Sequence, residues 1–488
     1  MIALLALSAL AQESPITPYG ELRYIGSQLS DFPVDAEGQA IGQNQWLDQR
    51  ARIGTLGRIS GIAEITVEFD AVTGQLAGDT WDIPGSIDEQ DREFHEALTA
   101  EGLFTPRKLS AETYFGNYQF ELGLVSSTWG LGMVANDGAT APLFGRADFG
   151  DRSIRLRGTH IPGGDGPAGR TTLLTTGALD FGIADDFARF QDGQRTGQAI
   201  FSLLSIGRRG KKVGMYSVVR QQWEALEGRQ TQAFVVDGYA DLPWELQSGW
   251  MVRTAVEVAS ILGRTNRATT YNARDWVGVT SLGIAGVATL ANPEDRIRVH
   301  MMTGLASGDG RPDDGFTRDF AFDRDYGVGM VLFDQLMGGI DANTYNLLSD
   351  PGIAGQPPDG IDALVTEGAF RRAAYIQPAV EVMPHEWVNL KAGVVLAAAT
   401  APYMHPFYSY RGGGTPYNQH DQPAEGRHLG TEIDWGVGFM NPENEDSETT
   451  QLRAGLEIQG GHLLLGKPLR TGNSKPISLL TATGRVLW

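Results

Sequence analysis

Apolar and polar residues alternate along many segments of this chain. In residues 63–70, apolar side chains at every second position alternate with acidic or hydroxyl side chains: Ala63, Ile65, Val67 and Phe69 against Glu64, Thr66, Glu68 and Asp70. A β-strand directs successive side chains to opposite faces, so a period of two predicts a strand with one apolar and one polar face. The pattern recurs at 213–223, 248–260, 295–304, 386–399, 428–440 and 451–461.

These alternating segments are long for strands of a soluble protein. Most span 9 to 14 residues, whereas soluble strands average about five or six and a tilted membrane-spanning strand needs about ten. Their polar faces carry charges of both signs, and the connections between them alternate short and long. A large soluble β-sandwich also has alternating strands, but it gives no reason for either feature. The pattern therefore favours an all-β fold, a single closed antiparallel transmembrane β-barrel.

The connections allow the strands to be counted. Eight short turns on one side and nine connections on the other predict about 18 strands, with 16 as the nearest alternative. Residues 325–339 look like a strand but would make the count odd, so we expect them to fold within a long connection. Residues 86–103 have apolar positions at helical spacing and predict a helix. We expect long outer loops near 73–108, 127–150, 307–365 and 400–427.

Composition narrows the function further. The chain has 488 residues, a formal net charge of −20 and no cysteine. An acidic surface repels phosphate backbones, which argues against a nucleic-acid partner, and the lack of thiols excludes disulfides and thiolate metal sites. The eight histidines form no HExxH motif, and no serine can be assigned as a partner to His300 or His462. We therefore expect no metal, no cofactor and no catalytic site.

The first residues have the pattern of an export signal. An apolar run ends in Ala-Leu-Ala at residues 9–11, the small-x-small arrangement that precedes signal-peptidase cleavage. The basic residues that open a complete signal peptide are missing from this run. We expect residues 1–11 to be all or part of a signal peptide and residues 12–488 to form the barrel.

Charged residues on the polar strand faces are the candidates for a channel lining. Residues two positions apart on a strand project to the same side, and several such pairs are charged. Each residue either pairs across strands and stiffens the wall or contacts the solute, and pairing is the more frequent role. The predicted lining comprises Arg50, Arg52, Glu64, Glu68, Asp70, Arg155, Arg157, Arg220, Arg253, Glu257, Arg296, Arg298, Lys391, Glu432 and Asp434.

A second charged set lies in the third long connection, where we expect it to narrow the pore mouth. Its members are Asp309, Arg311, Asp313, Asp314, Arg318, Asp319, Asp323 and Arg324. The arginines compete for the carboxylates and the EF-hand spacing is absent, so an ion-pair network is favoured over a calcium site. Earlier in the chain, Trp129 opens a glycine-spaced run. This run either folds against the inner wall or leaves the tryptophan in an interfacial aromatic girdle.

The last residues alternate as well, with Leu480, Ala482, Val486 and Trp488 on one side. In outer-membrane barrels the final strand commonly ends in an aromatic residue that the assembly machinery reads, and Trp488 resembles that signal.

Several motifs, in order, resemble those of a known class of proteins: LDQRARIG at 47–54, WGLGMVANDG at 129–138, SGDGRPDDG at 307–315 and LGTEIDWGVGF at 429–439. They resemble outer-membrane barrels of the alginate-export and porin type, closest to a largely uncharacterised family from myxobacteria and related Gram-negative bacteria. The resemblance implies an outer-membrane channel for polar solutes or a secreted polysaccharide. It implies outer-membrane lipid, lipopolysaccharide and the barrel-assembly machinery as partners. A lipid-acting barrel enzyme and a loop-based surface binding protein are the alternative functions.

Overall fold

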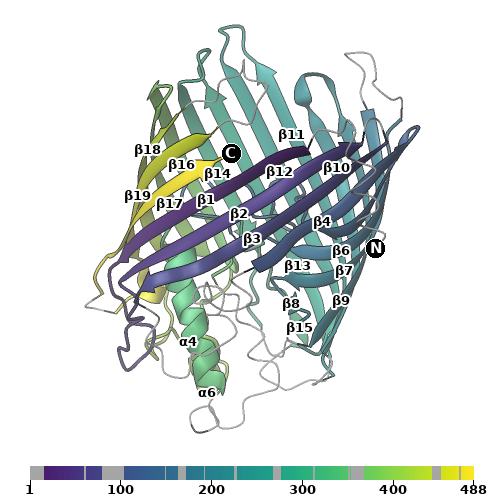
Figure 1. Ribbon diagram of the computed structural model, residues 1–488. Helices are drawn as coiled ribbons and strands as arrows, with labels where there is room; N and C mark the ends of the chain where they lie inside the picture. Colours follow the sequence, from purple (N-terminus) through teal and green to yellow (C-terminus); the bar gives the residue numbers. More distant parts are fainter. Residues whose placement is uncertain are drawn as a thin grey trace.

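The chain forms a closed, tilted barrel of antiparallel strands (Figure 1). The computed structural model describes residues 16–59, 62–79, 104–148, 150–162, 172–191, 193–224, 228–267, 276–311, 314–349, 352, 368–441, 452–471 and 474–488. The predicted signal peptide and the predicted helix at 86–103 lie outside the described residues. The predicted fold class, with 18 membrane strands, is confirmed.

Each long strand pairs with two antiparallel neighbours, and β1 pairs with β20 to close the barrel. The 18 long strands are β1 (Ile16–Leu29), β2 (Gln45–Ile59), β3 (Ala63–Gly78), β4 (Phe104–Phe115), β5 (Tyr118–Val125), β6 (Arg152–His160), β7 (Thr172–Asp185), β9 (Gln194–Ile206), β10 (Lys212–Glu224), β11 (Gln230–Glu245), β12 (Met251–Thr265), β13 (Val277–Ala291), β14 (Ile297–Ala306), β16 (Ala373–His385), β17 (Val388–Ala399), β18 (His428–Met440), β19 (Arg453–Leu465) and β20 (Ile477–Leu487).

The remaining elements are short and lie in the connections. They are the two-residue strands β8 (Ala188–Arg189) and β15 (Phe316–Thr317), a π-helical turn (Leu332–Met337), α4 (Gly338–Ser349), α6 (Pro406–Arg411) and two 3-10 turns (Arg208–Gly210 and Lys467–Leu469). None of the described helices is long and apolar enough to cross a membrane.

Long and short connections lie at opposite ends of the barrel. Turns such as residues 116–117 and 386–387 join strands at one end, whereas connections such as 307–372 and 400–427 lie at the other, where Figure 1 shows α4 and α6. We refer to the second end as the outer end, following the usual arrangement of bacterial barrels.

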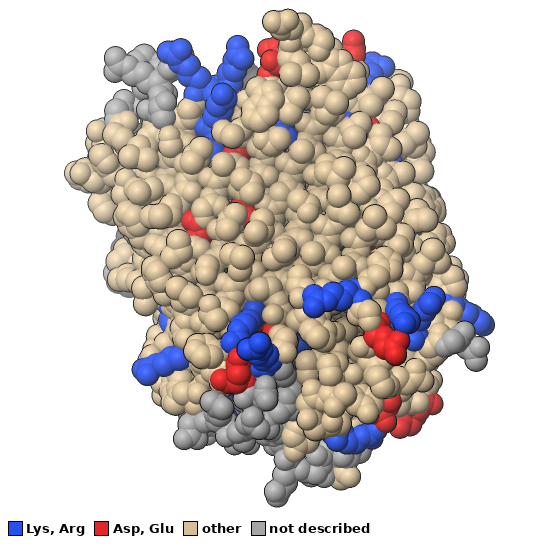
Figure 2. All heavy atoms as spheres, turned by 180° about the vertical axis from the view of Figure 1, so that it is seen from behind, with Lys and Arg blue, Asp and Glu red and all other residues tan. Residues whose placement is uncertain are grey.

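The outer face of the wall is apolar. Leu122, Leu179 and Leu262 project outward with 61%, 60% and 48% of their surface exposed, and Figure 2 shows a largely uncharged band with Lys, Arg, Asp and Glu gathered toward the two ends. Exposed aromatic side chains lie near both rims, for example Trp387 at one and Trp276 at the other. Apolar bands flanked by aromatic rings are the surface that a lipid bilayer solvates, so the barrel is built to span a membrane.

The final residue takes part in closing the barrel. The backbones of Trp488 and Gly20 exchange two hydrogen bonds, at 2.9 and 3.1 Å. The indole ring occupies the space that a Cβ on Gly20 would need. A side chain at position 20 would therefore displace the ring at the seam.

The inside of the barrel holds a packed core. Two segments from the outer end fold inward, and we call residues 126–148 the first infolded segment and residues 318–349 the second. Met133 and Phe144 of the first, and Phe320 and Leu332 of the second, are at most 1% exposed. They pack against small inward side chains of the wall, such as Ala285, Ala306 and Ala397. The strand-like residues 325–339 therefore form the π-helical turn and the start of α4 within this core, because the wall already has its 18 strands.

Candidate functional site

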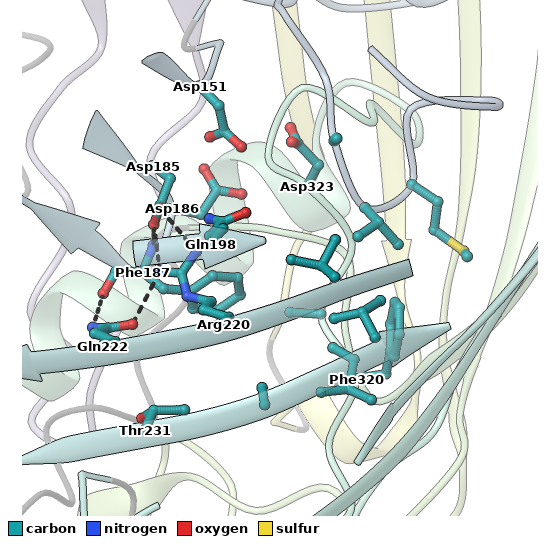
Figure 3. Close-up of a pocket in the computed structure, with 18 of the residues that line it drawn as sticks. Asp151, Asp185, Asp186, Phe187, Gln198, Arg220, Gln222, Thr231, Phe320 and Asp323 are labelled. Carbon is teal, nitrogen blue, oxygen red and sulfur yellow. Dashed lines mark hydrogen bonds and ion pairs between the residues drawn. The ribbon is translucent and has the colours of Figure 1, made fainter. Parts of the chain in front are cut away.

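The two infolded segments leave a cavity along one side of the barrel. Its volume is about 280 Å³, and its lining comes from strands β5–β7 and β9–β13, from both infolded segments and from residues near them. Figure 3 shows Asp151, Asp185, Asp186 and Asp323 directed toward one another around it, with Arg220 and Gln222 beside them. The cavity lies toward the outer end, since Asp151 precedes β6 and Asp186 follows β7 there.

Several charges at the cavity neutralise one another. Arg155 and Asp180 form a two-pronged ion pair between β6 and β7, at 2.7 and 2.6 Å. Arg220 on β10 binds Asp185 in the same manner, at 2.8 and 3.1 Å. Bidentate pairs of this kind hold both partners rigidly, so the main role of these four groups is to stiffen the barrel wall.

Three carboxylates remain beyond these pairs. Asp186 accepts a hydrogen bond from the backbone of Arg324, at 2.9 Å, and Asp323 accepts one from the backbone of Asn136, at 3.0 Å. For the Asp151 side chain, no hydrogen bond or ion pair is formed within the described part of the chain. Three acidic side chains therefore gather at one place in the cavity.

Burial and mutual repulsion weaken the ionisation of these three carboxylates. Burial raises the pKa of Asp151 well above its ordinary value, and the neighbouring Asp186 and Asp185 raise it further. Burial also raises the pKa of Asp186 to about 7, against the opposing effect of Arg324. The pKa of Asp323 is raised by burial and then by Asp186 and Asp151. A positive charge among them would relieve this repulsion.

The rest of the cavity is largely apolar. Val218, Val235 and Ile261 from neighbouring strands face Phe320 of the second infolded segment across it. One hydroxyl is an exception: Ser281 is 4% exposed and its Oγ has no hydrogen-bond partner in the described structure. The cavity therefore offers an acidic cluster, an apolar surface and an unused hydroxyl.

The sequence-predicted lining is spread over several parts of the wall and its rims, and only Arg155 and Arg220 of that set line this cavity. Arg50 and Arg52 belong to a separate buried network. Arg50 binds Glu21 at 2.5 Å and Asp148 at 3.0 Å, and Arg52 binds Asp70 at 2.7 Å. Glu68 lies beside Arg52, at 3.9 Å. This network ties the first infolded segment to β1, β2 and β3.

Two of the predicted lining residues, Glu257 and Glu432, bind backbone of the infolded segments. Glu257 accepts a hydrogen bond from the backbone of Leu131, and Trp129 donates one to the adjacent Asp237 at 3.0 Å. Glu432 accepts from three consecutive backbone N–H groups of the second segment. Asp434 lies two residues further along β18 and is fully buried. Glu257 and Glu432 therefore anchor the two infolded segments to the wall.

The other predicted lining residues pair near the rims or at the wall. Lys391 binds Glu457 at 2.6 Å and the carbonyl oxygen of Leu143 at 2.5 Å. The remaining pairs are Arg157 with Glu112 and Glu121, Arg253 with Asp241, Arg298 with Asp295 and Glu381, and Glu64 with Arg58. Arg296 lies exposed in the turn between β13 and β14 and is therefore not part of a strand face.

The predicted mouth network divides into two parts. At the rim, Arg318 pairs with Asp309 at 3.4 Å and with Asp314 at 2.8 Å, next to Arg311. Asp319 binds Arg371 and Arg372, whereas Asp323 and Arg324 lie deeper, at the acidic cluster. Asp313 lies outside the described residues.

Comparisons with known proteins find solved structures of similar fold but no sequence relatives. No protein-family model matches the chain, and no curated protein matches it. Among solved structures, OccK9 (OpdG) of Pseudomonas aeruginosa is similar with a TM-score of 0.51 and 8% identity, over 98% of this chain and 100% of that one. The chain has the fold of this barrel. OccK8 (OprE) of the same organism is similar with a TM-score of 0.49 and 9% identity, over 98% and 99% of the two chains. OpdK, solved with vanillate, has a TM-score of 0.49 and 8% identity, over 96% and 98%.

The structure places Trp129 within this barrel interior. Its indole stacks on Tyr216 at 5.3 Å between ring centres and meets the edge of Tyr239 at 6.3 Å. Of the two interpretations of its glycine-spaced run, folding against the inner wall is therefore correct. On the outer face, His462 Nδ1 lies 2.8 Å from Ser478 Oγ, a contact that joins β19 to β20. Within the described residues, no group of three or more His, Asp or Glu could hold a metal ion.

Sequence reasoning missed Asp151, Asp185 and Asp186. Asp185 is the last residue of β7, Asp186 follows it, and Asp151 immediately precedes β6, so all three lie at the outer ends of strands. Acidic residues at strand ends on the long-loop side are the signal that could have identified them.

Proposed function

We propose that this chain is an outer-membrane channel for small polar solutes. The observation that carries the proposal is the cavity between the wall strands β5–β7 and β9–β13 and the two infolded segments. A barrel of this strand number is wide enough for an aqueous channel unless loops fill it. Here the infolded segments fill much of it and leave this cavity, whose lining combines charged groups with apolar surface, as selective sites do. We propose that the cavity is the narrow part of the solute passage.

The size of the passage favours small solutes over a polymer. A polysaccharide chain would require the second infolded segment to leave the lumen, where Phe320, Leu332 and Leu336 are at most 1% exposed. Expelling these side chains into water would cost roughly 1.5–3 kcal/mol each. Polysaccharide passage, which the alginate-export resemblance suggests, is therefore the second candidate.

Reconstitution in planar lipid bilayers tests the proposal. We expect stepwise currents of low conductance, because ions must follow the narrow side passage. Liposome swelling should show uptake of small polar solutes and exclusion of oligosaccharides. A barrel that inserts and is silent in both assays would refute the channel, and release of fatty acids from the same liposomes would point to a lipid-acting enzyme.

The polysaccharide alternative has its own measurement. A strain lacking the protein is compared with its parent for surface polysaccharide and for growth on small polar nutrients. Loss of surface polysaccharide with unchanged solute uptake would favour the second candidate, and the reverse result would favour the first.

A further inference from the structure

We propose that the cavity binds amphipathic organic cations, solutes with an ammonium or guanidinium group on an apolar body. This inference rests on the proposed channel function and names its substrate class. The positive group would lie among Asp151, Asp186 and Asp323, and the body on the apolar surface.

The cavity lining contains more carboxylates than its arginines neutralise. Arg155 and Arg220 are each satisfied by an aspartate, and Arg267 binds Glu224 at 2.7 Å. Arg371 binds Asp319 at 3.2 Å. After these pairs the lining retains the three carboxylates, faced by Asp185, Arg220 and the partly opposing Arg324.

The three carboxylates converge on one space in the cavity. They come from three separate segments, before β6, after β7 and in the second infolded segment, and Figure 3 shows them turned toward one space. Backbone N–H groups fix Asp186 and Asp323 in place. An ammonium group donates three hydrogen bonds and a guanidinium five, so either could bridge carboxylates that converge in this way.

The cavity also offers an apolar surface and a buried hydroxyl without a partner. Val218, Val235, Ile261 and Phe320 would exclude water from the body of the solute. Ser281 Oγ is buried without a partner, and a buried hydroxyl without a hydrogen bond is costly. A polar group on the far end of the solute would satisfy it. A bare metal ion would use neither feature, which favours an organic cation.

The test uses the full-length protein in planar bilayers with benzylammonium as the probe. Benzylammonium should interrupt the current in a concentration-dependent manner, whereas benzoate and benzyl alcohol, which have the same ring, should not. In the double variant Asp151→Asn with Asp323→Asn, the residence time of the probe should fall at least tenfold, because charge-assisted hydrogen bonds are lost. Asp295→Asn, an exposed acid in a turn at the opposite end, is the matched control and should behave as the parent.

Ser281→Ala separates the hydroxyl from the charges. Tyramine carries a hydroxyl on the far side of its ring from the ammonium group, and benzylammonium has none. Ser281→Ala should shorten the residence of tyramine more than that of benzylammonium and leave the ion preference unchanged. Equal losses for both probes would overturn the role of Ser281.

A binding measurement keeps the inference independent of conduction. Benzylammonium is titrated calorimetrically into the detergent-solubilised barrel and into the double variant. A silent barrel that binds the probe through Asp151 and Asp323 would refute the channel and support the cation site. A conducting barrel with equal block by benzoate, or with unchanged block in the double variant, would overturn the cation site alone.

Discussion

Glu432 provides an example of how one side chain positions an entire segment. Its carboxylate accepts hydrogen bonds from the backbone N–H groups of Met330, Val331 and Leu332, at 2.5, 2.7 and 2.8 Å. These groups open the π-helical turn, and an anion at the start of a helix also interacts well with its dipole. Because the site is fully buried, water does not replace the acceptor.

Replacing Glu432 with alanine should therefore loosen the second infolded segment. Each buried N–H without an acceptor costs about 1–3 kcal/mol. Amide hydrogen exchange of residues 328–336, followed by mass spectrometry, should accelerate at least tenfold, by a conversion of about 1.4 kcal/mol per factor of ten. Glu432→Gln keeps one acceptor oxygen and should show a smaller increase. Equal exchange in the alanine variant and the parent would show that the segment is held by packing alone.

The acidic cluster should make ion selectivity depend on pH. Burial raises the pKa of Asp186 to about 7, so this carboxyl is largely neutral below that pH and charged above it. Preference for cations over anions, measured from the reversal potential in a salt gradient, should therefore rise between about pH 6 and pH 8. Asp186→Asn should flatten this rise. The control Asp314→Asn changes an acid at the rim whose pKa is lowered by Arg318, so it should keep the rise.

At the scale of elements, the second infolded segment joins the aromatic part of the core to the first infolded segment. Phe320 and Phe322 belong to an aromatic cluster with Tyr326 and Phe370. Asp325 accepts hydrogen bonds from the backbones of Asp148 and Gly150, at 2.6 and 2.5 Å. The segment thus carries part of the core and also holds the first segment in place.

Deleting residues 309–325 should widen the passage. The deletion removes the rim pairs, Phe320 and the acidic contributor Asp323, so single-channel conductance should rise roughly twofold or more and cation preference should weaken. Removal of residues 412–426, which follow α6 in another outer connection, is the control. Normal insertion with parental conductance would show that residues 309–325 do not limit the flow.

The strands could be predicted from the sequence, and the interior largely could not. Alternation in stretches such as 63–70 is a local property, and it reveals strand faces directly. Glu257 and Glu432 are fully buried, and each accepts hydrogen bonds from the backbone of an infolded segment. Their partners, Leu131 and Val331, lie more than a hundred residues away in sequence. Nothing local distinguishes an acid that faces water from one that receives a loop backbone, so predicted lining residues became anchors.

At the scale of the whole molecule, the barrel depends on one seam between its first and last strands. The register from Glu21 opposite Leu487 to Leu29 opposite Leu479 closes the wall. Trp488 extends this seam with two further backbone hydrogen bonds to Gly20. We expect this last residue to matter for assembly as well as for stability.

Replacing Trp488 with alanine should reduce the amount of folded barrel in outer-membrane fractions and slow its appearance. The variant lacks the ring that covers Gly20, and it also lacks the aromatic residue that we propose the assembly machinery reads. Heat-modifiable migration on gels after pulse labelling measures both the amount of folded barrel and the rate at which it appears. Trp387→Ala removes an equally interfacial tryptophan from a turn and is the control; an equal loss there would show a general need for interfacial aromatics.

The off-centre position of the cavity divides the wall into two halves with different evolutionary freedom. Where the infolded segments touch the wall, even one added carbon meets a neighbour: a Cβ on Gly393 would lie 2.8 Å from Phe144, and one on Gly461 would lie 2.9 Å from Val331. Inward positions that face the cavity, such as Ala233 and Val279, border open space instead. In homologues that bind other solutes, we therefore expect many amino-acid substitutions in β11 and β13 near the cavity. We expect few substitutions of the small residues of β17 and β19.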